Sequence, residues 1–163
     1  MSARSQPLPN AAFWLGDTWT PAGVVTAAAV LPIIYSLAVP FVVLDVWVQI
    51  YQAIAFRLLG IRPVRRRDYL VLDRQRLPYL TALQKANCVY CGYVNGLLAF
   101  VREIAGRTEQ FWCPIQHARR VRGQQGRHRR FAPYGDAEAF RRLRPVLRAD
   151  LSARSRQRRR WHG

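Results

Sequence analysis

The sequence predicts a mainly α-helical protein in which one kinked, membrane-embedded helix precedes a small, metal-stapled, α-rich cytoplasmic region. Residues 24–50 form an apolar stretch whose only charged residue is Asp45. All three cysteines of the chain follow this stretch. Of the 26 basic residues, 24 lie after residue 60 together with seven acids, so the net charge of +17 belongs to the C-terminal part. These three observations indicate a membrane anchor joined to a strongly basic region.

The apolar stretch is long enough to cross a membrane once. A spanning helix needs about 20 apolar residues, so residues 24–50 suffice for one crossing but not for two. Pro32 and Pro40 each remove a backbone donor and predict kinks, which leaves a re-entrant helix as the alternative. A cleavable signal peptide is disfavoured because no small-residue cleavage site follows the apolar core.

The flanks of this stretch resemble the edges of a bilayer. Aromatic residues typical of membrane interfaces lie on both sides, namely Trp14, Trp19, Trp47 and Tyr51. Residues 49–59 are amphipathic, and we expect them to follow the headgroup surface until Gly60 ends them. For Asp45 we favour a position near the interface, with an ion pair as the alternative.

Charge asymmetry predicts the orientation of the anchor. Four arginines flank its C-terminal side, namely Arg62, Arg65, Arg66 and Arg67, whereas Arg4 alone precedes it. The positive-inside rule then places the C-terminal region in the cytoplasm, at a bacterial inner membrane. The cysteines agree, because an odd number with one C-x2-C pair suits a reducing compartment better than a disulfide scaffold.

Four parts of the chain are expected. They are an N-terminal interfacial segment (1–21), the membrane anchor with its amphipathic end (22–60), a Cys/His module (61–121) and a partly disordered arginine-rich extension (122–163). In the module we expect a short strand near 68–72 and a helix over 97–105 that begins after an Asn95-Gly96 turn. In the extension, residues 136–151 predict a basic amphipathic helix, with Asp136 as its cap and Pro145 as an interruption.

Cys88, Cys91, Cys113 and His117 have the spacing C-x2-C-x21-C-x3-H. Three thiolates and one imidazole suit tetrahedral zinc, and four ligands leave no open position, so the predicted site is structural. Two knuckles, at 87–92 and 112–117, would supply the ligands. The alternatives are buried cysteines that bind nothing, an iron–sulfur cluster, or His128 or His162 in place of His117. Covalent haem is disfavoured because Gly92 follows Cys91.

The basic residues predict anionic partners. Besides the four arginines that follow the anchor, we expect Arg119, Arg120 and Arg122 to contact anionic lipid headgroups or an acidic protein, although a merely solvated basic tail is the alternative. No P-loop, dinucleotide fingerprint or paired-carboxylate motif is present, so we expect no enzyme. A catalytic pair of Cys113 or Cys88 with His117 is the alternative.

The segments RDYLVLDRQRLPYL, NCVYCGYVNG and REIAGRTEQFWCPIQHARR resemble a family of small bacterial membrane proteins of uncharacterised activity. The resemblance covers roughly residues 40–120, and its two cysteine motifs are the most specific part. It implies a bacterial membrane protein with this cysteine arrangement and brings no activity with it.

These observations together predict a non-enzymatic accessory or interaction subunit of a membrane complex. A membrane-tethered nucleic-acid-binding module is one alternative, suggested by the arginine clusters at 119–130 and 154–160. An iron–sulfur or redox component of an electron-transfer complex is the other.

Overall fold

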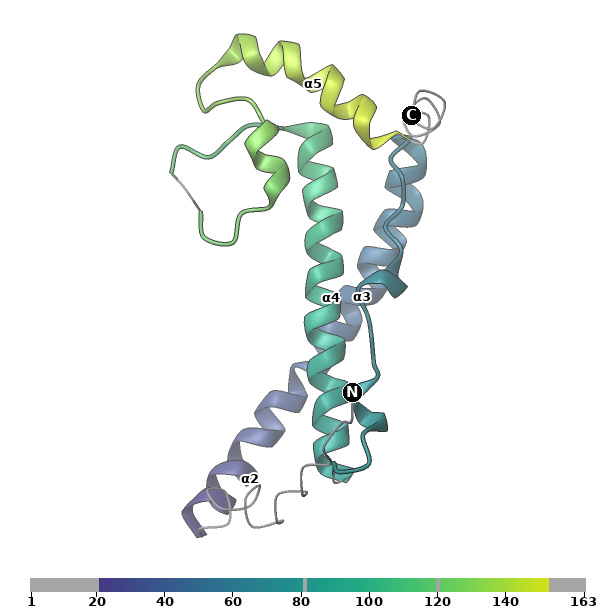
Figure 1. The fold of residues 1–163 in the computed structure, drawn as a ribbon, viewed down its shortest axis with the longest axis vertical. Coiled ribbons are helices and arrows are strands. Elements are labelled where there is room, and N and C mark those ends of the chain that lie inside the picture. Colours follow the sequence, from purple (N-terminus) through teal and green to yellow (C-terminus); the bar gives the residue numbers. More distant parts are fainter. Residues whose placement is uncertain (1–20, 81, 120, 153–163) are drawn as a thin grey trace, which may run out of the picture. The chain divides into compact units, whose positions relative to one another are not determined.

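A computed structural model of the protein describes residues 21–80, 82–119 and 121–152 (Figure 1). The principal elements are α2 (Pro21–Ser36), α3 (Ala38–Tyr51), a π-helix (Gln52–Phe56), α4 (Ala82–Trp112) and α5 (Ala137–Leu151), with short 3-10 helices at Arg66–Asp68, Arg74–Arg76 and Gly126–Arg130. The prediction of a mainly helical protein is confirmed. Within the described ranges only isolated β-bridges occur, so the strand predicted near 68–72 is wrong.

In the described part of the chain, one helical stretch, Ala29–Phe56, is long and apolar enough to cross a membrane. Its apolar side chains are largely exposed, including Val39, Val43 and Trp47 with exposed fractions of 68%, 62% and 69%. A contiguous apolar surface of this kind marks a site of contact with lipid or protein. The predicted interfacial segment 1–21 lies almost entirely outside the described residues, Trp14 and Trp19 included.

Proline explains why this stretch is divided into α2 and α3. Pro40 has no N–H, and a proline ring clashes with the carbonyl of the residue four positions earlier, which here is Ser36. The backbone accordingly departs from the helix at Leu37, whose N–H donates to the Ile34 carbonyl at 3.2 Å. The kink predicted at Pro40 is therefore confirmed, whereas Pro32 lies inside the continuous α2.

The chain forms two compact units, each built from two separate segments. The first comprises residues 1–43 and 72–94, and the second comprises residues 44–71 and 95–163. In the first unit the end of α2 packs on the first half of α4. The Tyr35 hydroxyl donates to Asn87 Oδ1, the Tyr90 hydroxyl donates to the Ile34 carbonyl at 2.7 Å, and the two tyrosine rings lie 5.3 Å apart.

The second unit has a small apolar core closed by α5. Phe56, Leu97, Phe100 and Pro114 are fully buried there. The predicted helix over 136–151 is confirmed as Ala137–Leu151, with Asp136 Oδ1 accepting from the Ala139 N–H at 2.8 Å and Pro145 inside the helix without ending it.

Polar contacts join α5 to the rest of this unit. Gln110 Nε2 donates to the Leu147 carbonyl at 2.9 Å, and Arg148 Nε donates to the Phe111 carbonyl at 2.7 Å. The Arg148 guanidinium also lies 4.4 Å from the centre of the Phe111 ring. Removing Gln110 would leave a buried carbonyl without this partner, which is costly.

α4 contains the helix predicted over 97–105 but begins much earlier, and Asn95-Gly96 lies in its interior. The predicted turn there is therefore wrong. The glycine serves a tertiary contact instead, because a Cβ at Gly96 would lie 2.7 Å from the Tyr69 backbone oxygen and 3.1 Å from Leu70 Cα. Glycine is the residue that permits so close an approach of a second backbone.

Substitution of Gly96 tests this packing. Gly96→Ala should destabilise the protein by about 1–3 kcal/mol, because backbone rather than a flexible side chain must move, and this exceeds the helix-propensity gain of about 1 kcal/mol. Denaturant unfolding in detergent, followed by circular dichroism, measures the change. Gly126→Ala is the matched control, since a Cβ there meets nothing within 4 Å. Equal stabilities of the two variants would refute the packing role.

Candidate functional site

Asp45, the acid of the apolar stretch, is buried and ion-paired. Its side-chain oxygens accept from Arg66 Nε at 3.1 Å and from Arg66 Nη2 at 2.6 Å, and Gln49 Nε2 donates to Oδ1 at 2.9 Å. Of the two alternatives for Asp45, the structure shows the ion pair. Arg66, predicted to contact anionic lipid or an acidic protein partner, pairs with Asp45 within the chain.

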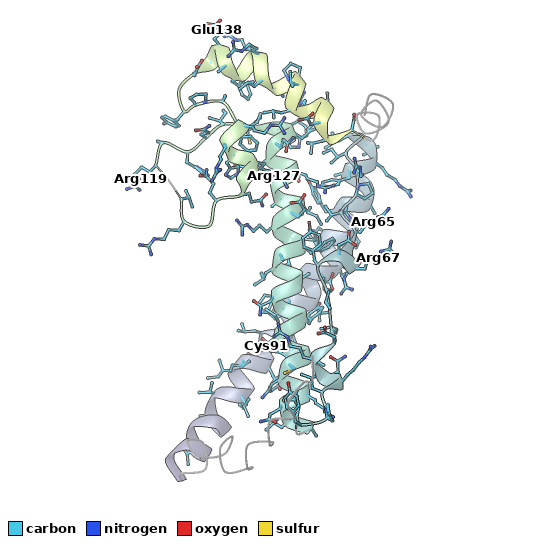
Figure 2. The ribbon with its side chains drawn as sticks, viewed as in Figure 1. Arg65, Arg67, Cys91, Arg119, Arg127 and Glu138 are labelled. Carbon is cyan, nitrogen blue, oxygen red and sulfur yellow. The ribbon has the colours of Figure 1, made fainter. Side chains whose placement is uncertain are left out.

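The other arginines of this flank are disposed differently. Arg65 and Arg67 are exposed (Figure 2), and Arg67 Nε lies 4.0 Å from Asp68 Oδ1. Arg62 is fixed through its backbone, because its N–H donates to the Leu151 carbonyl at 3.0 Å and its carbonyl accepts from Arg107 Nη1 at 2.6 Å. Arg65 and Arg67 are therefore the two members of this group best placed to meet an external anion.

The cysteines lie at two places along α4. Cys88 and Cys91 belong to the early turns of the helix, where Cys91 is exposed (Figure 2), and Cys113 follows the last helical residue. Residues 87–92 are therefore helical, and the predicted knuckle there is wrong as local structure. The reason is that α4 continues without interruption from Ala82 to Trp112, so it includes the C-x2-C segment.

Among the described residues, no group of three or more His, Cys, Asp or Glu side chains is arranged to hold a metal ion. Cys88, Cys91, Cys113 and His117 are accordingly not found as such a group. Zinc binding by these four residues stays a prediction, and His162 lies outside the described part of the chain.

The chain after α4 forms a loop that returns to its own start. The Gln116 N–H donates to the Ala132 carbonyl at 2.8 Å, and the Ala132 N–H donates to the Pro114 carbonyl at 2.9 Å. Gln116 Nε2 adds a bond to the Phe131 carbonyl at 2.9 Å. These bonds close residues 114–132, which we call the basic loop, at its base.

Further contacts fix the middle of the basic loop against α4. Gln125 Nε2 donates to the Arg102 carbonyl at 2.6 Å, and Arg102 Nη2 donates to the Gly123 carbonyl. Gly106 makes room for this contact, because a Cβ at that position would collide with the Gln125 amide. Gly123 has a φ of 71°, in the left-handed region that glycine adopts without strain.

Glu103 joins the basic loop to α4 electrostatically. Its carboxylate accepts from Arg107 Nε at 2.8 Å and from Arg127 Nη2, and all three side chains are about one-fifth exposed. Glu103 and Arg107 form an i, i+4 pair on α4, whereas Arg127 comes from the basic loop. Burial alone would raise the pKa of Glu103, but its hydrogen bonds to Arg127 and Arg107 and their charges outweigh burial and lower it.

The two histidines of the basic loop lie together. His128 Nε2 is 2.7 Å from Glu109 Oε2, and the rings of His117 and His128 are 6.1 Å apart. His128, one alternative metal ligand, is therefore engaged with Glu109.

No known protein-family model, curated protein or solved structure matches this chain. The residues that sequence reasoning missed are Arg127 and Gln125, which anchor the basic loop. One signal was present for the first, because Glu103 and Glu109 are the only acids between residues 74 and 135 and so attract the surrounding arginines.

The lowered pKa of Glu103 predicts how stability depends on pH. A folded pKa below the ordinary value of 4.5 means that the unfolded chain binds the proton more readily, so the stabilisation is complete above pH 4.5 and is lost as pH falls through the folded pKa. Glu103→Gln should therefore flatten the fall of the melting temperature below pH 4.5.

The control for this experiment is Glu138→Gln. Glu138 is exposed on α5 (Figure 2), and no contact of its carboxylate with another described residue is seen. This variant should keep the wild-type slope. An identical slope for wild type, Glu103→Gln and Glu138→Gln would show that Glu103 does not couple folding to protons.

Proposed function

We propose that this protein is a non-enzymatic accessory protein of the bacterial inner membrane. In this proposal the apolar helix crosses the membrane once, the C-terminal region lies in the cytoplasm, and its basic surface binds anionic headgroups and an acidic face of a membrane complex. One observation carries the proposal: the apolar helix Ala29–Phe56, whose apolar side chains are largely exposed, is followed closely by the exposed arginines Arg65 and Arg67.

The distribution of charge supports recognition of anions. Residues 110–135 contain six arginines and no acid. Such a surface attracts anionic partners over a range set by the ionic strength. Arg65 and Arg67 are exposed on the flank of the apolar helix, and Arg119 and Arg122 are exposed in the basic loop. Arg120, expected to act with them, lies outside the described residues.

The ion pair of Asp45 supports the proposal that the apolar helix lies in a membrane. A lone carboxylate is costly at bilayer depth and is tolerated when it pairs with a basic group. Asp45 is 5% exposed and has such a partner in Arg66. The pair would allow the apolar helix to carry an acid near its cytoplasmic end without exposing a charge to lipid.

Partner capture tests the proposed function. The full chain should be crosslinked in cells, purified in a mild detergent and compared with Arg65→Gln/Arg67→Gln. We expect a defined membrane complex to copurify at a constant ratio with the wild type and several-fold less with the variant, because the proposed contact depends on these exposed charges.

A matched pair on α5, Arg141→Gln/Arg142→Gln, removes the same charge at exposed positions and should retain the partner. A wild type that always migrates alone on native gels would contradict the proposal. Copurified nucleic acid, released steeply by salt, would favour the nucleic-acid alternative instead.

Metal analysis tests the predicted zinc site. If Cys88, Cys91, Cys113 and His117 bind zinc, the purified wild type should contain about one zinc per chain, and Cys88→Ser should lose it, because a structural zinc takes four ligands. Exposed Cys91, labelled with a thiol reagent, should then be protected by zinc. A metal-free wild type would refute the site, and absorbance in the visible region would point to iron–sulfur chemistry.

A further inference from the structure

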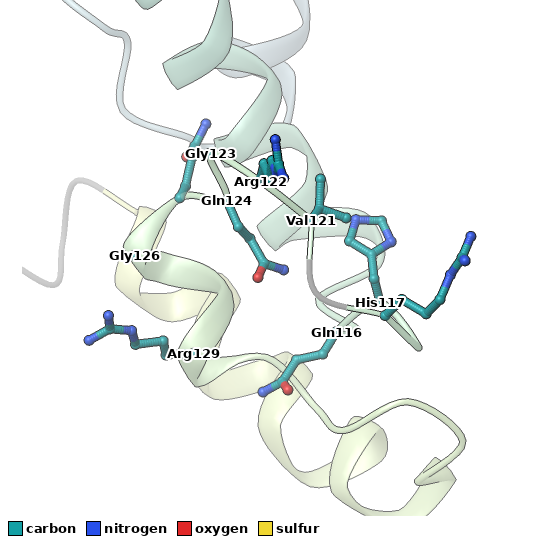
Figure 3. A pocket seen from close by; sticks show the side chains of 10 residues that line it. Gln116, His117, Val121, Arg122, Gly123, Gln124, Gly126 and Arg129 are labelled. Carbon is teal, nitrogen blue, oxygen red and sulfur yellow. The ribbon is translucent and has the colours of Figure 1, made fainter.

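A cavity of about 750 Å³ lies within the basic loop. The residues that matter for its chemistry are Gln116, His117, Arg119, Arg122, Gln124 and Arg129 (Figure 3). Pockets for small ligands have volumes of roughly 300–1,000 Å³. We infer that this cavity binds the phosphate group of a small organic phosphate, which deepens the proposed function and rests on its assignment of the basic surface to anion recognition.

The arginines of the basic loop fall into two classes, according to whether they form an ion pair within the fold. Arg127 pairs with Glu103, and Arg130 pairs with Asp150, so these two hold the fold together. The three that line the cavity, Arg119, Arg122 and Arg129, are exposed and show no ion pair or hydrogen bond with another residue of the described part of the chain. Like charges gathered around one cavity repel each other, and a bound anion removes that repulsion.

The donors around the cavity suit phosphate better than a carboxylate. Each guanidinium offers a planar fork that matches two oxygens of a phosphate, and a phosphate monoester carries nearly two negative charges at neutral pH. Figure 3 shows the Gln124 side chain directed into the space between His117 and Arg129, with Gln116 nearby. The Gln124 amide has no hydrogen-bond partner among the described residues, so it can add a donor.

The hydrogen bonds that hold the walls of the cavity do not involve Arg119, Arg122 or Arg129. The walls are held by the bond of Gln116 to the Phe131 carbonyl, by that of Gln125 to the Arg102 carbonyl and by the left-handed backbone at Gly123. A preformed site loses less entropy when a ligand binds. Substituting the lining arginines should therefore change affinity without unfolding the loop.

Size indicates an organic phosphate rather than the inorganic ion. The cavity is as large as those that bind drug-sized molecules, so a phosphate alone would leave most of it filled with water. The side chain of Val121 and the two glutamines offer mixed apolar and amide surface for the remainder of such a ligand. A phosphorylated headgroup and a free organic phosphate share this chemistry.

Calorimetric titration of the full chain in a maltoside detergent tests the inference. The probes are inorganic phosphate, adenosine monophosphate and a soluble short-chain phosphatidic acid. We expect saturable binding of at least one organic phosphate at one site, tighter than inorganic phosphate and weaker at high salt. Saturation by the nucleotide alone identifies a free organic phosphate, and saturation by the lipid alone identifies a headgroup.

The variant Arg122→Gln/Arg129→Gln should weaken this binding by about a hundredfold, since each charge-assisted contact contributes about tenfold. Arg141→Gln/Arg142→Gln has the same net charge and should stay within about twofold of the wild type. Arg122→Lys/Arg129→Lys keeps the charge without the planar fork and should give an intermediate affinity, which covers the case of a glutamine variant that does not fold.

Absence of saturable binding by any organic phosphate, or equal losses in the two glutamine pairs, would overturn the site. Because this titration needs no partner, its failure leaves the partner-capture result standing. A wild type that binds an organic phosphate but copurifies with no partner would instead overturn the proposed function alone.

Discussion

The carboxylate of Glu103 is the negative charge on which the second unit depends. Two guanidiniums converge on it, one from the next turn of α4 and one from the basic loop 24 residues away. Arg107 extends the contact through its bond to the Arg62 carbonyl. Three separate segments are thus joined at one partly buried acid, in a region where acids are scarce. Breaking such a group by removing its acid is costly, because the two arginines then repel each other.

The arginines of the chain therefore differ in their role, because some pair with acids of the fold and others do not. Arg66, Arg107, Arg127 and Arg130 pair with acids of the fold, whereas Arg65, Arg119, Arg122 and Arg129 are exposed and form no ion pair with another described residue. Because acids are few, only some of the arginines form ion pairs within the fold, and the others remain at the surface. The proposed contacts with headgroups, an acidic partner and phosphate are all made by these remaining arginines.

Local patterns in the sequence predicted the local features of the fold. Asp136 before an amphipathic run predicted a capped helix, and Pro40 predicted a kink near which the helix is interrupted. Long-range features could not be predicted this way. Gly96 resembles a turn residue, and only the approach of the Tyr69 backbone explains it as a helix residue. The partners of Asp45 and Glu103 lie 21 and 24 residues away, a separation that no periodicity encodes.

The π-helix Gln52–Phe56 changes the direction in which the side chains that follow it point. A π turn accommodates one residue more than an α turn, so later side chains are rotated by about 100° relative to an uninterrupted α-helix. Before it, Val46, Trp47 and Ile50 are exposed while Val48 is buried, and within it Phe56 is 1% exposed while Ile54 is exposed. Gln52 uses the widened turn to bond Val64 through both its N–H and its carbonyl. By directing Phe56 into the core, the irregular turn lets the end of a largely exposed helix contribute to the interior of the second unit.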